Sequence, residues 1–283
     1  MKSIKIAGVP EHFNLPWQLC IENGEFEKIG IDLQWNDIPE GTGKMCQMLR
    51  NGETDIAVIL TEGIVKDILG GNDCSIVQVY VESPLIWGIH VGANSKYNVL
   101  ADLENTKIAI SRYGSGSHLM AYVNAQNQNW NTETLQFEIV NTIDGAVEAL
   151  TNGTADYFMW ERFMTKPFED KGIFRRVADC PTPWPCFVIA VRNEFLEANK
   201  QSIALLLETI NNTTIKFRDI PNIDRTLASK YHQKLEDIQE WLSLTKWSQK
   251  TLEEKVLNKI QNQLFDLKII DKKGTFAEIV KEV

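Results

Sequence analysis

Two ten-residue segments, about 100 residues apart, resemble each other and constrain the fold more than any other feature. The first reads LRNGETDIAV (49–58) and the second reads LTNGTADYFM (150–159), with Leu, Asn, Gly and Asp at the same offsets. In each, the pattern predicts an amphipathic helix that ends at Asn-Gly, because glycine accepts a positive φ. A turn with Asp then leads into a buried strand. The alternative is a chance match, since Asn-Gly dipeptides are common.

The order of elements around these segments extends the likeness. IKIAGV and TKIAIS each predict a short buried strand. Each is followed by a predicted helix, a second strand (IDLQWND or LQFEIVN), another helix and then the repeated segment. Strands that alternate with helices indicate parallel sheets with right-handed crossovers.

The sequence therefore predicts an α/β chain with two lobes, each a parallel or mixed sheet flanked by helices. The apolar runs 83–94 and 184–196 predict two strands that cross between the lobes as a hinge. Residues 1–88 and 190–283 are expected to form the first lobe, which includes the C-terminal helices. Residues 89–189 are expected to form the second.

Composition excludes several classes of protein. The net charge of −9 argues against a nucleic-acid surface, which would need a basic stripe. The five cysteines are odd in number and lack zinc-type spacing, so reduced thiols are expected. The start MKSIKIAGVP lacks the apolar core of a signal peptide. A cytoplasmic location is therefore expected, or a periplasmic one if the sequence begins after a removed signal.

The loop SRYGSGSH (111–118) joins a predicted strand to a predicted helix. Ligands of parallel α/β sheets bind beyond the carboxyl ends of the strands, where the free N–H groups of a helix favour anions. Gly114 and Gly116 permit a close backbone approach, and the serine hydroxyls can donate. His118 is expected to be neutral. The alternative is a plain turn in which Ser117 is only the N-cap.

The segment PEGTGKM (39–45) resembles that loop, because Thr42 and Gly43 open a predicted helix in the first lobe. A ligand between two such helix ends would be a small anion or a polar heterocycle, and a capped turn is the alternative. Flat aromatic rings at the strand ends suit a flat ligand, or else pack in the core. Glu161 could accept hydrogen bonds from an amine, and Glu62 is placed at the matching position of the first repeat. Alternatively, both carboxylates pair with nearby Lys or Arg. The candidate ligand-binding residues are His12, Phe13, Thr42, Gly43, Glu62, Gly114, Ser115, Gly116, Ser117, His118, Trp160, Glu161 and Trp184.

No catalytic set stands out in the sequence. There is no HExxH motif, no nucleophile elbow and no metal-spaced histidine cluster. We therefore expect no metal and no cofactor, and name no catalytic residue.

The segments SRYGSGSHLMA, NGETDIAV, WERFMTKPFEDKGIFRRV and LEDIQEWLSLTKW carry a family resemblance. They resemble the periplasmic-binding-protein fold of the second topological type, in the group that binds sulfonate, taurine, nitrate and thiamine-pyrimidine precursors. The chain is most similar to a subgroup without signal peptides, shared by bacteria and fungi, whose ligand is not established. The resemblance spans nearly the whole chain and implies two α/β lobes that close a cleft over a ligand.

Two departures bear on function. Members that serve a transporter carry a signal peptide or a lipoprotein cysteine, and the thiamine-pyrimidine synthases carry a CCCFC motif; this sequence shows none of these. The first hypothesis is a solute-binding protein for a small anionic or heteroaromatic ligand, with a transporter or a regulatory protein as partner. The second is an enzyme on the same scaffold that uses His118, Lys44 or Glu161 as acid or base. The third is a ligand sensor.

Overall fold

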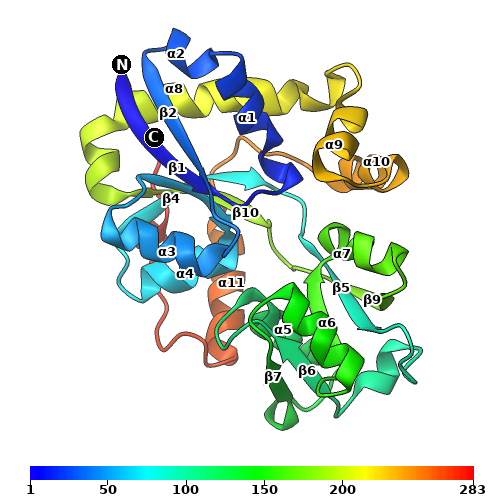
Figure 1. Cartoon of the computed structure of the whole chain (residues 1–283). Coiled ribbons are helices and arrows are strands. Elements are labelled where there is room, and N and C mark those ends of the chain that lie inside the picture. The colour runs from blue at the N-terminus through cyan, green and yellow to red at the C-terminus, as the bar shows by residue number, and fades with distance from the viewer. The chain divides into compact units, whose positions relative to one another are not determined.

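The computed structural model describes residues 1–283, which divide into two compact units (Figure 1). Unit 1 comprises Met1–Ser83 and Trp184–Val283, and unit 2 comprises Pro84–Pro183. The borders between the units lie a few residues before the predicted positions 88/89 and 189/190.

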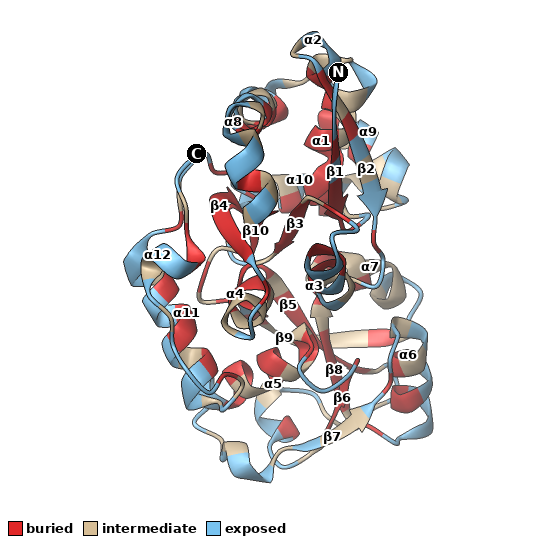
Figure 2. Ribbon diagram, turned by 90° about the vertical axis from the view of Figure 1, so that its left-hand side faces the viewer, coloured by how far each residue is buried: buried red, intermediate tan, exposed pale blue.

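Unit 1 is built on a five-stranded sheet with the order β2-β1-β3-β10-β4. The strands are β1 (Lys2–Gly8), β2 (Ile31–Asp37), β3 (Ile56–Leu60), β4 (Cys74–Val81) and β10 (Phe187–Arg192). The first three are parallel, whereas β10 runs antiparallel between β3 and β4. Every residue of β4 and the whole of β3 up to Ile59 are buried, as expected for strands with helices on both faces (Figure 2).

Two groups of helices flank this sheet. The helices α1 (Leu15–Glu22), α2 (Glu25–Lys28) and α8 (Asn193–Lys216) pack together, and so do α3 (Thr42–Asn51), α4 (Thr61–Leu69), α11 (Glu254–Asp266) and α12 (Phe276–Ile279). The helices α9 (Ile223–Tyr231) and α10 (Leu235–Leu244) pack against each other, and the short turns η1 (His12–Asn14) and η4 (Phe217–Asp219) complete the unit. No helix of the structure has both the length and the apolar character needed to cross a membrane.

Unit 2 repeats the plan with the order β7-β6-β8-β5-β9. Its strands are β5 (Ile86–Gly92), β6 (Lys107–Ile110), β7 (Gln136–Ile139), β8 (Tyr157–Glu161) and β9 (Phe174–Pro181). Its helices are α5 (Gly116–Asn127), α6 (Ile143–Asn152) and α7 (Arg162–Asp170), with the short turns η2 (Leu100–Leu103) and η3 (Thr132–Thr134). As in unit 1, three parallel strands accept one antiparallel strand, here β5 between β8 and β9. The predicted two-lobe α/β fold with mixed sheets is confirmed.

The two repeated segments form the same helix end and the same aspartate hydrogen bond in their units. Gly52 and Gly153 end their helices with φ values of 70° and 72°, where a side chain would be strained. Asp55 then accepts the N–H of Lys5 at 3.0 Å, and Asp156 accepts the N–H of Lys107 at 2.8 Å. Each repeated aspartate therefore ties the strand that follows it to the parallel neighbour of that strand, β3 to β1 in unit 1 and β8 to β6 in unit 2.

The two apolar runs predicted to cross between lobes form β5 and β10, and each belongs to one sheet. The chain leaves unit 1 between Ser83 and Pro84 and returns between Pro183 and Trp184. All five cysteines are free and buried.

Candidate functional site

The loop between β6 and α5 is a tight turn that ends in a serine cap. Gly114 has a φ of 76°. Ser115 is the N-cap, and its Oγ accepts the N–H of His118 at 3.3 Å. The N–H groups of Gly116 and Ser117, at the first two helical positions, have no acceptor in the protein. An anion at this helix end would supply that acceptor.

The hydroxyl of Ser117 is committed to the fold. It is buried, and its Oγ accepts the N–H of Ser111 at 3.0 Å. The same Oγ lies 3.1 Å from the Oγ of Ser115. Ser117 therefore links the end of β6 to α5, and the role of N-cap that the sequence left open for it belongs to Ser115.

The imidazole of His118 lies among aromatic rings. Its Nδ1 accepts the N–H of Gly114 at 3.1 Å, so a neutral ring carries its proton on Nε2. The rings of Tyr113, Tyr122 and Phe137 lie with centroids 5.3, 5.2 and 4.8 Å from it, all edge to face. These contacts orient the ring and were not predicted, because Phe137 belongs to a different strand.

Trp160 and Glu161 are the last two residues of β8. Trp160 is half-buried, stacks on Phe158 at 5.4 Å and meets Trp87 edge to face at 6.3 Å. Glu161 is buried, and its Oε2 accepts the N–H of Met164 at 2.7 Å. This carboxylate caps α7, where the helix dipole stabilises its negative charge.

In unit 1, the starts of α3 and α4 are packed together. Gly41 caps α3 with a φ of 75° and without a side-chain hydrogen bond. The N–H groups of Thr42 and Gly43 have no acceptor in the protein. A Cβ at Gly63 would lie 2.3 Å from the Cγ2 of Thr42. Glycine at position 63 is therefore required for this close approach.

Glu62 and Trp184 are brought together by the fold. The carboxyl group of Glu62 is only 2% exposed, and its Oε2 accepts the indole N–H of Trp184 at 2.8 Å. Its Oε1 has no partner. Burial raises the pKa of Glu62 to about 7, and the hydrogen bonds from its own backbone and from Trp184 oppose that rise. Trp184 is the first residue of the chain after it returns to unit 1, so this bond anchors the returning segment to α4.

Glu62 does not match Glu161 in the repeat, which corrects the sequence interpretation. Equal offsets pair Leu60 with Glu161, and these two residues cap α4 and α7 with nearly the same backbone angles. Glu62 lies one step inside its helix instead. The misplacement arose because both strands end close to a glutamate.

His12 and Phe13 form η1, directly after β1, and lie in an aromatic cluster. The imidazole of His12 is fully buried, 4.2 Å from the ring of Trp241 and 5.6 Å from that of Tyr231 between centroids. Neither ring nitrogen has a hydrogen-bond partner. Burial lowers the pKa of His12 to about 3, so the ring is neutral. Trp241 and Tyr231 lie more than 200 residues after His12 in the chain, so no local sequence pattern could predict these ring contacts.

The proposed acid and base residues are engaged in other contacts. Lys44 Nζ lies 3.7 Å from a carboxylate oxygen of Glu53, Glu161 caps a helix, and His118 binds Gly114 within its own loop. No group of three or more His, Cys, Asp or Glu side chains is arranged to hold a metal ion.

The sequence and the fold of the chain are similar to those of known proteins. Residues 87–180, nearly all of unit 2, match a family model described as Ca3427-like PBP. The product of the Candida albicans CA3427 gene, described as having the generic periplasmic binding protein fold, superposes with a TM-score of 0.89. The two share 24% sequence identity over 99% of this chain and 96% of the other. The chain has the periplasmic-binding-protein fold.

Two further solved structures share this periplasmic-binding-protein fold. The alkanesulfonate-binding protein SsuA from Xanthomonas axonopodis pv. citri, bound to MOPS, has a TM-score of 0.83 at 15% identity, over 100% of this chain and 99% of that one. The nitrate-binding protein NrtA from Synechocystis PCC 6803 has a TM-score of 0.63 at 15% identity, over 84% of this chain and 69% of that one. No curated protein sequence matches the chain. The resemblance to sulfonate- and nitrate-type binding proteins is thus confirmed for the fold.

Proposed function

We propose that this protein is a solute-binding protein whose two lobes close over a small anionic or heteroaromatic ligand. One observation carries the proposal: in each unit, the first two N–H groups of a helix that follows a strand have no acceptor in the protein. These are Thr42 and Gly43 in α3, and Gly116 and Ser117 in α5.

The chemistry of these groups favours an anion. Unpaired N–H groups at a helix start carry partial positive charge and bind sulfonate, phosphate, nitrate or carboxylate oxygens without a formal cation. The hydroxyls of Ser115 and Ser117 support the loop, so the ligand contacts assigned to these serines pass to the backbone. Glu62 adds a buried carboxyl oxygen without a partner, which suits a ligand that also carries an N–H group.

Similarity to known binding proteins supports the same function. Three solved structures with the same fold are described as binding alkanesulfonate, aliphatic sulphonate or nitrate. Another is the ligand-binding component of an ABC-type import system from Staphylococcus aureus. The partner implied for this chain is a transporter or a regulatory protein that recognises the ligand-bound form.

A thermal-shift screen tests the proposal with four probes: an alkanesulfonate, nitrate, a thiamine pyrimidine and a small carboxylate. A ligand at 100 times its dissociation constant should stabilise the fold by about 2.7 kcal/mol. We expect at least one probe to raise the melting temperature in a concentration-dependent way. If all four leave it unchanged at millimolar concentration, the proposed ligand classes are wrong.

A further inference from the structure

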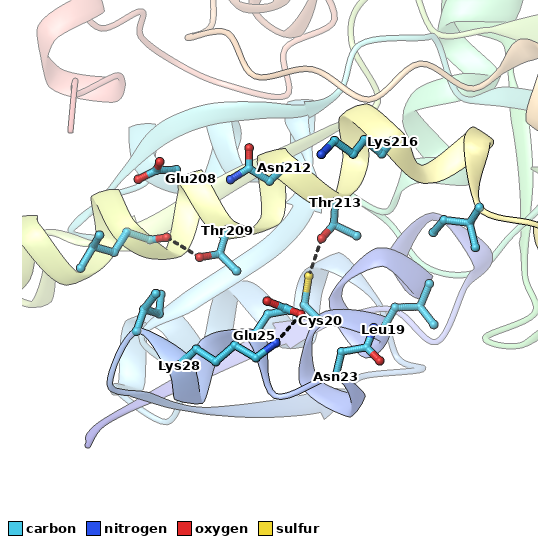
Figure 3. Close-up of a pocket in the computed structure, with 13 residues that line it drawn as sticks. Leu19, Cys20, Asn23, Glu25, Lys28, Glu208, Thr209, Asn212, Thr213 and Lys216 are labelled. Atoms are coloured by element: carbon cyan, nitrogen blue, oxygen red, sulfur yellow. Dashed lines mark hydrogen bonds and ion pairs between the residues drawn. The ribbon is translucent and has the colours of Figure 1, made fainter.

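A second candidate site is a groove in unit 1 between α8 and the pair α1–α2. Its volume is about 600 Å³, within the range of small-molecule sites. At the base, the thiol of Cys20 and the hydroxyl of Thr213 lie 2.9 Å apart and join α1 to α8 (Figure 3). None of the candidate ligand-binding residues described above lines this groove.

The wall formed by α8 carries one charge of each sign. Glu208 and Lys216 are both exposed, and the side chain of neither has an ion pair or hydrogen bond in the protein. Eight residues separate them, which corresponds to about 12 Å along a helix axis. Figure 3 shows them toward opposite ends of the α8 wall. The charged pair on the facing wall, Lys28 and Glu25, is neutralised by its own contact of 2.7 Å.

Uncharged polar groups line both walls of the groove, and Asn212 lies between the two charges on α8. Asn212 on α8 and Asn23 at the end of α1 line the groove, and the side-chain amide of neither has a partner in the protein. An amide side chain both donates and accepts, which matches the alternating groups of a peptide backbone. Leu19, Ile29 and Leu205 add apolar surface for small side chains.

From this arrangement we infer that the groove binds a short zwitterionic peptide in an extended conformation. The peptide's ammonium group pairs with Glu208 and its carboxylate with Lys216. About four extended residues, at roughly 3.3 Å each, span the distance between the two charges. This site is independent of the proposed anion site, because the two share no residue.

An NMR titration of the full chain with tetra-alanine tests the inference. Binding is measured from the chemical-shift changes of ¹⁵N-labelled backbone amides in α1 and α8. The comparison peptides are N-acetyl-tetra-alanine and tetra-alanine amide, which each lack one terminal charge. We expect saturable binding of tetra-alanine and about threefold weaker binding of each blocked peptide, as befits exposed ion pairs. Absence of saturable shifts, or equal affinity for all three peptides, overturns the inference.

Variants then assign each charge to its partner. Glu208→Gln should weaken the binding of tetra-alanine about threefold and leave the binding of N-acetyl-tetra-alanine unchanged. Lys216→Gln should also weaken the binding of tetra-alanine about threefold, but it should leave the binding of tetra-alanine amide unchanged. Lys200→Gln is the matched control, because Lys200 lies on α8 outside the groove and pairs with Glu197. Equal losses for free and blocked peptides would show a change of groove shape instead and would also overturn the assignment.

Discussion

Burial shifts the pKa values of two side chains in unit 1 in opposite directions. His12 has a folded pKa of about 3, below its ordinary value of 6.5. Its contribution to stability is therefore fully present above pH 6.5 and is lost as the pH falls toward 3. Glu62 has a folded pKa of about 7, above its ordinary value of 4.5. Its contribution is fully present below pH 4.5 and is lost as the pH rises through 7.

Variants at these positions should change the pH dependence of stability in opposite senses. His12→Phe removes a ring that binds a proton in the unfolded chain but stays neutral in the folded one, so its unfolding free energy should gain on wild type by about 1.4 kcal/mol per pH unit between pH 6 and 4. Glu62→Gln should gain on wild type as the pH rises from 5 to 7. Urea unfolding at each pH measures both differences. Parallel curves for wild type and variants would contradict the assigned protonation states.

For individual residues, the sequence predicted where each one lies in its helix or strand better than it predicted which contacts its side chain makes. The run Gly114–His118 does start a helix, and Glu161 does end a strand. The roles of Ser117 and His118 depend on Ser111, Tyr122 and Phe137. Ser111 and Tyr122 are local to the loop and to α5, whereas Phe137 is brought to the ring of His118 from β7 by tertiary packing, which a linear motif does not encode.

At the level of helices, the contact between the starts of α3 and α4 can be tested by its effect on the free energy of unfolding. Gly63→Ala places a Cβ against the Cγ2 of Thr42, and we expect a loss of about 1–2 kcal/mol of unfolding free energy. Thr42→Ser removes that methyl group. In the Thr42→Ser background, Gly63→Ala should therefore be neutral or stabilising by up to about 1 kcal/mol, since alanine favours a helix over glycine. Additive effects of the two substitutions in urea unfolding would refute the contact.

The order of strands and helices could be predicted because each element carries its own pattern. Gly52, Asp55, Gly153 and Asp156 have the same function in both repeats, so one short comparison established two sheets. The match of Glu62 with Glu161 failed because it rested on composition near a strand end and not on equal offsets. The aromatic surroundings of His12 depend on α9 and α10, which follow unit 2 in the chain.

For the whole molecule, the repeat accounts for the three parallel strands of each sheet, whereas the antiparallel strands β5 and β10 come from the two segments next to the crossings between the units. Each unit also presents the start of a helix with two unpaired N–H groups after a strand, but these helices, α3 and α5, occupy different places in the repeat, in which α3 corresponds to α6. The proposed anion site therefore rests on one helix start from each unit and not on a duplicated helix. The fold could be predicted because patterns spread over the whole chain specify it, whereas the identity of a ligand would depend on a few side chains that carry no such pattern.

In the proposed function, backbone N–H groups at the start of α5 bind the ligand. Gly116 is the first residue of the helix, a position that proline tolerates, and the extended backbone of Ser115 suits a residue before proline. Gly116→Pro therefore removes one N–H group and keeps the helix, whereas Gly116→Ala adds a side chain and keeps the N–H. Titration calorimetry should use the probe that stabilises wild type most. We predict binding at least about tenfold weaker for Gly116→Pro than for Gly116→Ala; equal affinity of the two variants would contradict the account.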